Sequence, residues 1–292
     1  MQVPSGRSGR YGCFLLSPLL LFSSAVHAPP SLRYNSLMKN YKAYIFDMDG
    51  TVLDTLTDLN DALNHALKEH GHFGAYTGDE TRHFFGSGVL VALARVLFTE
   101  QVLGLTPETV RTSSAPLMEK DFPLAKLYSI GTEQDEITAT LDRAEIDRIS
   151  ATYRPWYNAH CEIATGPYPG IVEAVRDLRN LGIRTSVVSN KPDAAVQKLS
   201  EQYFPGLFDF SIGEQEPLFR RKPAPDMVLA AAQKLGCSLE GSVYVGDSEV
   251  DLETARACGM DFLCVTWGFR TRSYLEELGV TSFAETPEEL LP

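Results

Sequence analysis

Beyond residue 170, strand-like apolar segments alternate with helical segments, and this alternation restricts the fold of the 292-residue chain more than any other feature. Neighbouring parallel strands need helical crossovers between them. The pattern therefore predicts an α/β fold with a doubly wound parallel sheet, whose site lies at the carboxyl ends of the strands. The predicted strands are 184–189, 208–212, 242–246 and 261–265. The predicted helices are 170–181, 192–202, 224–235 and 249–258.

A long helical segment interrupts this pattern after its first strand. Between about residues 57 and 167 no buried β-type run occurs, and apolar residues recur at helical spacing. We therefore expect a Rossmann-like core made of residues 38–56 and 168–292, with residues 57–167 inserted as a helical cap. Residues 122–135 show no clear periodicity, and we expect a loop of the cap there.

The first 37 residues differ in composition from the rest of the chain. No Asp or Glu precedes Asp47, and the apolar stretch 13–22 is too short to span a membrane. Two interpretations remain open. Residues 1–28 could act as a secretory signal peptide, which would export the protein. We favour Met38 as the true start, because it leads directly into the first strand, and we then expect residues 1–37 to be dispensable.

Two carboxylates, Asp47 and Asp49, follow the first predicted strand directly. In an extended chain, residues two apart point to the same side, so the pair repels itself unless a cation or a shared proton joins it. Gly50 and Thr51 then supply backbone freedom and N–H groups that suit a phosphate. Phosphoryl transfer through an aspartyl-phosphate needs a carboxylate nucleophile, a second carboxyl for proton transfer and a magnesium ion. Alone, the motif could equally be an exposed acidic turn.

Three further polar motifs follow predicted strands or begin predicted helices. Ser189 and Asn190 end one strand just before a helix, where a hydroxyl, an amide and helix N–H groups can hold phosphate oxygens. Lys222 belongs to a basic cluster that precedes the next helix, and Asp247 and Asp251 follow another strand. Because carboxyl ends of parallel strands share one sheet edge, the motifs together indicate a single site.

This set of motifs resembles the haloacid dehalogenase-like hydrolase superfamily in its phosphatase form. The resemblance extends from about residue 42 to residue 291. Four segments resemble its phosphoglycolate phosphatase-like branch in particular: 168–171, 188–192, 246–248 and 265–270. Superfamily members that attack carbon–halogen bonds or phosphonates lack the second aspartate, so the resemblance implies that Asp49 directs this chain to phosphate esters or anhydrides.

The resemblance also implies roles for individual residues. Asp47 matches the nucleophile, and Asp49 matches the general acid/base. The residues expected to bind the substrate or its phosphate are Ser189, Asn190, Lys222, Thr51 and Arg270. Arg270 follows the last predicted strand, and we expect it to sense the leaving group together with the turn 86–88.

A magnesium ion is the expected cofactor. The expected metal ligands are Asp47, Asp49 (through its backbone carbonyl), Asp247 and Asp251, the last directly or through water. Magnesium prefers oxygen ligands and keeps several waters, which suits such a set. The sequence contains no Cys/His cluster of the kind that zinc selects.

The composition of the chain limits the binding partners and the cellular compartment that we expect. The net charge of −12 argues against a nucleic-acid surface, which would be basic. Five cysteines, an odd number without a CxxC pair, are typical of reduced thiols, so we expect a cytoplasmic protein without stable membrane insertion. The oligomeric state stays open.

Three functions compete on this evidence. The first is a magnesium-dependent phosphatase acting on a small phosphorylated metabolite, with 2-phosphoglycolate favoured and inorganic pyrophosphate as the alternative. The second is a sugar phosphomutase, which would use the same Asp47 and Asp49 but return the phosphate to the substrate. The third, a non-catalytic binding protein, is disfavoured because the full set of catalytic residues is present.

Overall fold

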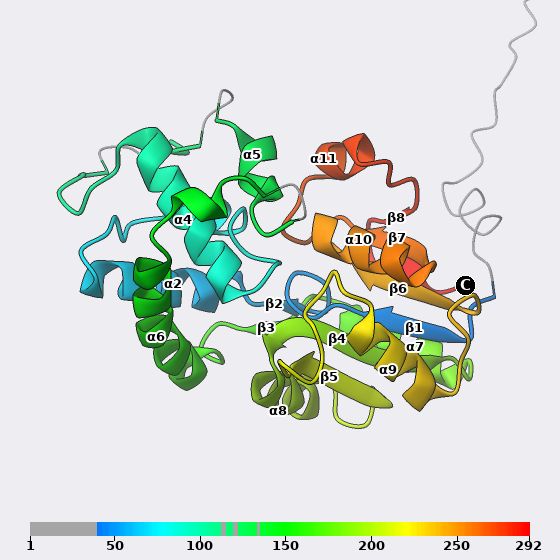
Figure 1. The fold of residues 1–292 in the computed structure, drawn as a ribbon. Helices are drawn as coiled ribbons and strands as arrows, with labels where there is room; N and C mark the ends of the chain where they lie inside the picture. Colours follow the sequence, from blue (N-terminus) through cyan, green and yellow to red (C-terminus); the bar gives the residue numbers. More distant parts are fainter. Residues whose placement is uncertain (1–39, 112–114, 119–121, 133–134) are drawn as a thin grey trace, which may run out of the picture. The chain divides into compact units, whose positions relative to one another are not determined.

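The computed structural model describes residues 40–111, 115–118, 122–132 and 135–292 (Figure 1). The predictions for residues 1–37 lie outside these residues. Six strands form one parallel sheet in the order β5-β4-β1-β6-β7-β8. Their bounds are β1 Ala43–Phe46, β4 Arg184–Pro192, β5 Phe210–Glu214, β6 Ser242–Gly246, β7 Asp261–Val265 and β8 Phe283–Ala284. The predicted doubly wound parallel sheet is confirmed.

Strand β1 lies at the centre of the sheet because both of its faces are apolar and fully buried. Ala43 and Ile45 belong to a core cluster that also contains residues of α9 (Asp226–Leu235). Phe46 points to the other face and contacts Phe208 at a ring-centroid distance of 6.2 Å. The sheet is therefore covered on both sides, as parallel sheets require.

The remaining core helices follow the strands in alternation. They are α7 Ile171–Asn180, α8 Asp193–Tyr203, α10 Glu249–Cys258, α11 Arg272–Glu277 and the 3₁₀ turn Pro287–Leu290. Observed and predicted bounds of α7 to α10 and of β4 to β7 differ by no more than three residues. The core elements α11, β8 and the 3₁₀ turn were not predicted; β8 has only two residues and is too short to leave a periodic pattern.

The helices of the predicted cap lie between two short strands. β2 (Leu53–Asp54) and β3 (Gly166–Pro167) pair antiparallel and so bring the two ends of this segment together. The helices are α2 Leu56–Glu69, α3 Gly78–Thr81, α4 Val89–Leu103, α5 Leu124–Ser129 and α6 Arg143–His160, with a 3₁₀ turn at Thr138–Thr140. They gather on one side in Figure 1, and α2, α4, α5 and α6 contribute to one apolar cluster, which also includes Phe269 of the core. The exact division at residues 57 and 167 stays a prediction.

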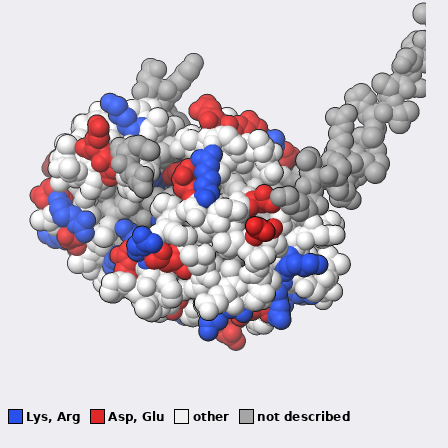
Figure 2. Space-filling view, turned by 45° about the vertical axis from the view of Figure 1, so that its right-hand side comes forward, with Lys and Arg blue, Asp and Glu red and all other residues white. Residues whose placement is uncertain are grey.

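The expected loop at residues 122–135 was wrong in part, because α5 lies within it. Leu127 and Tyr128 of α5 are buried, but a helix of only six residues is too short for a periodic pattern to stand out. Within the described residues, no helix has both the length and the apolar character needed to cross a bilayer. On the face shown in Figure 2, basic and acidic side chains are interspersed.

Candidate active site

Asp47 is held at the edge of the sheet by its backbone. Its N–H donates to the carbonyl of Val245 on β6 at 2.8 Å, so the chain continues the strand ladder up to this residue. The turn that follows passes very close to Asp247. Gly50 has a φ of +84°, and a Cβ at this position would lie 2.4 Å from Asp247 Oδ2. Glycine is therefore required for the motifs after β1 and β6 to meet.

Lys222 lies between two of the carboxylates. Its Nζ is 2.7 Å from Asp47 Oδ1 and 2.8 Å from Asp251 Oδ1, and it donates to the Tyr244 hydroxyl at 3.1 Å. Burial alone would lower the pKa of Lys222, but the negative charges of Asp251 and Asp47 raise this pKa above its ordinary value. The lysine is therefore a fixed positive charge beside Asp47.

Three buried carboxylates gather around this lysine. Asp47, Asp247 and Asp251 each offer an oxygen, and these atoms all lie within 4.8 Å of one another. Burial and the charge of Asp251 raise the pKa of Asp47, and the same two causes raise the pKa of Asp247 to about 7. One lysine does not balance three carboxylates, so the cluster fits a divalent cation that takes oxygen ligands.

Asp247 is oriented by its neighbours. Its Oδ2 accepts the Phe269 N–H at 2.6 Å, and its Oδ1 accepts the Thr51 hydroxyl at 3.2 Å. Thr51 is completely buried, and the structure places its hydroxyl against this carboxylate. The predicted contact between Thr51 and a phosphate stays a prediction.

Asp251 organises the turn after β6. Its Oδ2 accepts the Asp247 N–H, the Ser248 N–H and the Ser248 hydroxyl, the last at 2.7 Å. Its Oδ1 faces Lys222. These contacts suit a supporting acid that fixes Asp247 and Lys222. Its predicted role as a metal ligand stays a prediction.

The end of β4 supplies Ser189 and Asn190. Both line a cavity of about 60 Å³ that also contains Asp47 and Asp49. The amide of Asn190 bonds to the backbone of Lys222 twice, accepting from its N–H at 2.8 Å and donating to its carbonyl at 3.1 Å. Asn190 thus holds the lysine loop against the sheet.

Lys191 lies in the candidate site, although it was not among the predicted site residues. Its Nζ lies 2.8 Å from Asp49 Oδ1 and donates to the Tyr157 hydroxyl at 2.5 Å. Asp49 therefore points to Lys191, and its carboxylate is not part of the three-residue acidic cluster. The available signal was position: Lys191 directly follows Ser189 and Asn190 at the strand end.

Residues of the predicted cap line the opposite wall of the cavity. They include Phe85, Gly86 and Gly88 from the turn before α4, and Tyr153 and Tyr157 from α6. The turn at 86–88, which we expected near the leaving group, therefore does reach the cavity. Its predicted contact with substrate remains to be tested.

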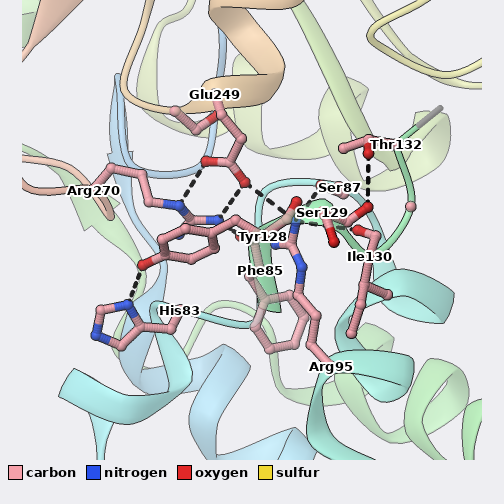
Figure 3. Close-up of polar contacts among 12 residues, drawn as sticks. His83, Phe85, Ser87, Arg95, Tyr128, Ser129, Ile130, Thr132, Glu249 and Arg270 are labelled. Carbon is pink, nitrogen blue, oxygen red and sulfur yellow. Dashed lines mark hydrogen bonds and ion pairs between the residues drawn. The ribbon is translucent and has the colours of Figure 1, made fainter. Parts of the chain in front are cut away.

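Arg270 lies elsewhere, in a buried network shown in Figure 3. It is not among the residues that line the cavity. Its Nε and Nη2 donate to both carboxylate oxygens of Glu249 at 2.7 and 2.9 Å, and Arg95 Nη2 from α4 donates to Glu249 Oε1 at 3.2 Å. Arg270 also donates to the backbone carbonyls of Arg82 and Phe85 at 2.6 and 2.8 Å.

Two aromatic residues complete the network. The guanidinium of Arg270 lies over the Tyr128 ring, 4.5 Å from its centroid, and the Tyr128 hydroxyl contacts His83 Nδ1 (Figure 3). Burial, with the charges of Arg270 and Arg82, lowers the pKa of His83 to about 4, so this imidazole is neutral near pH 7. Arg270 thus connects the core to the segment that carries Phe85. Its predicted contact with the leaving group stays a prediction.

Comparison with known proteins identifies the family of this chain. The sequence profile of haloacid dehalogenase-like hydrolases matches residues 41–259. A phosphoglycolate phosphatase of Cereibacter sphaeroides is 32% identical over 228 residues, which cover 77% of this chain and 85% of that protein. A phosphoglycolate phosphatase of Mesorhizobium japonicum is 26% identical over 80% of this chain and 86% of its own length.

Solved structures agree with this result. A structure described as a "putative phosphoglycolate phosphatase" from Lactobacillus delbrueckii subsp. bulgaricus has a TM-score of 0.76 at 42% identity, covering 86% of this chain and 97% of that one. A haloacid dehalogenase-like hydrolase from Streptococcus pneumoniae, 20% identical, shares the fold with a TM-score of 0.64 over 87% and 98% of the two chains. The chain belongs to the haloacid dehalogenase-like hydrolase family, in its phosphoglycolate phosphatase-like branch, and is a phosphoric monoester hydrolase.

Proposed function

We propose that this protein is a Mg²⁺-dependent phosphatase that hydrolyses a small phosphorylated metabolite, preferably 2-phosphoglycolate, through an aspartyl-phosphate on Asp47. The observation that carries the proposal is the position of Asp47. It lies at the wall of the cavity, ion-paired with Lys222 at 2.7 Å and close to two further buried carboxylates. A bound Mg²⁺, held by Asp47 and Asp247, would neutralise negative charge on the phosphoryl oxygens.

The chain's own residues account for both halves of the reaction. Lys222 opposes the rise in the pKa of Asp47 that burial and Asp251 cause, and a bound divalent cation would oppose it further. In its ionised form the Asp47 carboxylate attacks the phosphorus while the bond to the leaving oxygen breaks. Asp49 donates its proton to that oxygen. In the second half, Asp49 takes a proton from water as the water oxygen attacks phosphorus, and the bond between phosphorus and Asp47 breaks to release phosphate. Ser189 and Lys222 position the phosphoryl group throughout.

The preference for a small substrate rests on the cavity and on the relatives. Side chains such as Phe85 and Tyr153 cover the cavity from the side of the predicted cap, opposite Asp47 and Ser189. Relatives of this chain are named phosphoglycolate phosphatases. Inorganic pyrophosphate and sugar phosphates remain the competing substrates. The odd number of five cysteines, without a CxxC pair, supports a cytoplasmic location.

A substrate panel tests the proposal. Phosphate release would be measured with 2-phosphoglycolate, pyrophosphate, glucose phosphates and a phosphopeptide, with Mg²⁺ and after chelation. We expect 2-phosphoglycolate to have the highest kcat/KM, chelation to stop turnover reversibly, and Asp47→Ala to abolish it. Asp79→Asn, at a side chain that is 87% exposed, is the matched control and should keep wild-type activity.

Three results would contradict parts of this proposal. Full activity in Asp47→Ala would exclude the mechanism. An advantage of tenfold or more for the phosphopeptide, about 1.4 kcal/mol in transition-state binding, would exclude a small substrate. Isomerised sugar phosphate in place of free phosphate would identify a phosphomutase.

A further inference from the structure

Lys191 connects the proposed general acid to a helix of the predicted cap. Its ammonium lies between Asp49 Oδ1, at 2.8 Å, and the hydroxyl of Tyr157 on α6, at 2.5 Å. Asp49 belongs to the turn after β1, whereas Tyr157 lies 108 residues further along the chain. This contact therefore depends on how α6 packs against the core.

The surroundings of Lys191 favour a fixed lysine over one that reaches for substrate. The side chain of Lys191 is only 2% exposed, and Tyr157 is 3% exposed. The Tyr157 ring is stacked on Tyr153 at a centroid distance of 5.5 Å and an interplanar angle of 12°, which restrains the phenol. Burial raises the pKa of Tyr157, so the phenol stays neutral. It accepts a hydrogen bond from the Lys191 ammonium but adds no negative charge that would compete with Asp49 for this ammonium.

We propose that Lys191 and Tyr157 are positioning residues for proton transfer: Tyr157 fixes the Lys191 ammonium, and Lys191 orients the Asp49 carboxyl. With Oδ1 paired to Lys191, the proton that Asp49 delivers resides on Oδ2. The acid–base part of the reaction then depends on α6 being packed as it is here. The inference rests on the proposed function, in which Asp49 is the acid.

The chemistry of the leaving group separates this role from a structural one. An alkoxide such as that of glycolate or ethanol is strongly basic and needs the proton of Asp49 as the bond breaks. The 4-nitrophenolate ion is weakly basic and departs without a proton. Loss of Asp49 alignment should therefore slow alkyl phosphates much more than 4-nitrophenyl phosphate, while a general loss of folding would slow all of them equally.

The experiment measures kcat and KM of Lys191→Met and Tyr157→Phe with 2-phosphoglycolate, ethyl phosphate and 4-nitrophenyl phosphate. We expect kcat to fall about 10- to 100-fold for both alkyl phosphates and less than about threefold for 4-nitrophenyl phosphate, with little change in KM. Tyr157→Phe removes one oxygen and keeps the stacked ring, so it carries the test if Lys191→Met does not fold. Tyr76→Phe is the matched control, because Tyr76 is a buried tyrosine of the same helical segment that does not line the cavity. Among the described residues the Tyr76 hydroxyl has no hydrogen-bond partner, so this variant should keep the wild-type ratio between substrates.

Two results would overturn the inference. Equal losses on all three substrates would show that the contact only supports the structure. A loss with 2-phosphoglycolate but not with ethyl phosphate would mean that Lys191 binds the substrate carboxylate instead. Absence of phosphatase activity in the wild-type protein is a different result, since it refutes the proposed function and not this contact.

Discussion

Removing the charge of Glu249 should destabilise the protein strongly. This carboxylate is the shared partner of Arg95 and Arg270, whose side chains are completely buried. Burial would raise the pKa of Glu249, but the charges of Arg270 and Arg95 lower it below its ordinary value. Glu249→Gln keeps the shape of the side chain and leaves two buried guanidinium groups without a counter-charge. Breaking a buried ion pair in this way costs about 3–5 kcal/mol.

Urea unfolding measures this cost, as the change in the free energy of unfolding between wild type and variant. The matched control is Asp147→Asn, which removes the carboxylate of an exposed ion pair with Arg143, where the two side chains are 55% and 64% exposed. Exposed pairs on a helix contribute about 0.3–0.5 kcal/mol, so this control should unfold almost as the wild type does.

A double variant tests whether Glu249 and Arg95 stabilise the protein through their mutual contact. In the Glu249→Gln background, Arg95→Met removes a charge that has already lost its partner, so it should cost less than Arg95→Met does in the wild type. The account of the network is refuted if Glu249→Gln costs no more than the Asp147→Asn control. Strictly additive costs of Glu249→Gln and Arg95→Met would also count against it.

Three further outcomes are expected. The hydrogen bond to Glu100, and to a lesser extent the one to Glu145, raises the pKa of His72 above 6.5. The protonated imidazole therefore stabilises the fold fully below pH 6.5, and this contribution is lost as the pH rises through the raised pKa. The difference in unfolding free energy between the wild type and His72→Gln should be larger at pH 5.5 than at pH 9. Mg²⁺ should raise the thermal midpoint of the wild type but not that of Asp247→Asn, and equal shifts would exclude Asp247 as a ligand. Gly50→Ala should lose at least tenfold in kcat, about 1.4 kcal/mol, because its Cβ would meet Asp247 at 2.4 Å, and wild-type turnover would show that the turn can relax.

The core was predictable because its signals are local. A buried parallel strand must be apolar on both faces, and β1 and β6 show this directly in the sequence. Their ends carry Asp47 and Asp247, so parallel topology alone predicts that these carboxylates meet. The short helix α5 and strand β8 could not be predicted, since their few residues pack on elements far away in the chain.

The contacts of the predicted cap were not predictable for a different reason. Lys191 and Arg270 both follow predicted strands, and the sequence offers no means of deciding which of the two side chains faces the cavity. In the structure, Arg270 is bound by Glu249 at the start of α10 and does not line the cavity. Lys191 does line it, and contacts Tyr157 and Asp49. Both outcomes depend on where α4 and α6 pack, which is a tertiary property.

The two buried contacts also explain how a mostly helical segment can be aligned precisely with a catalytic core. Apolar surfaces tolerate sliding, because their attraction has no direction. Buried ion pairs add little net stability, but they require specific geometry, since any displacement leaves a charge unpaired. Glu249 fixes α4 through Arg95, and Lys191 fixes α6 through Tyr157. Lys191 lies near the end of β4, and Glu249 begins the helix that follows β6. A shift of either helix of the predicted cap by an ångström or two would therefore break a contact of a buried charged group beside the sheet that carries the proposed site.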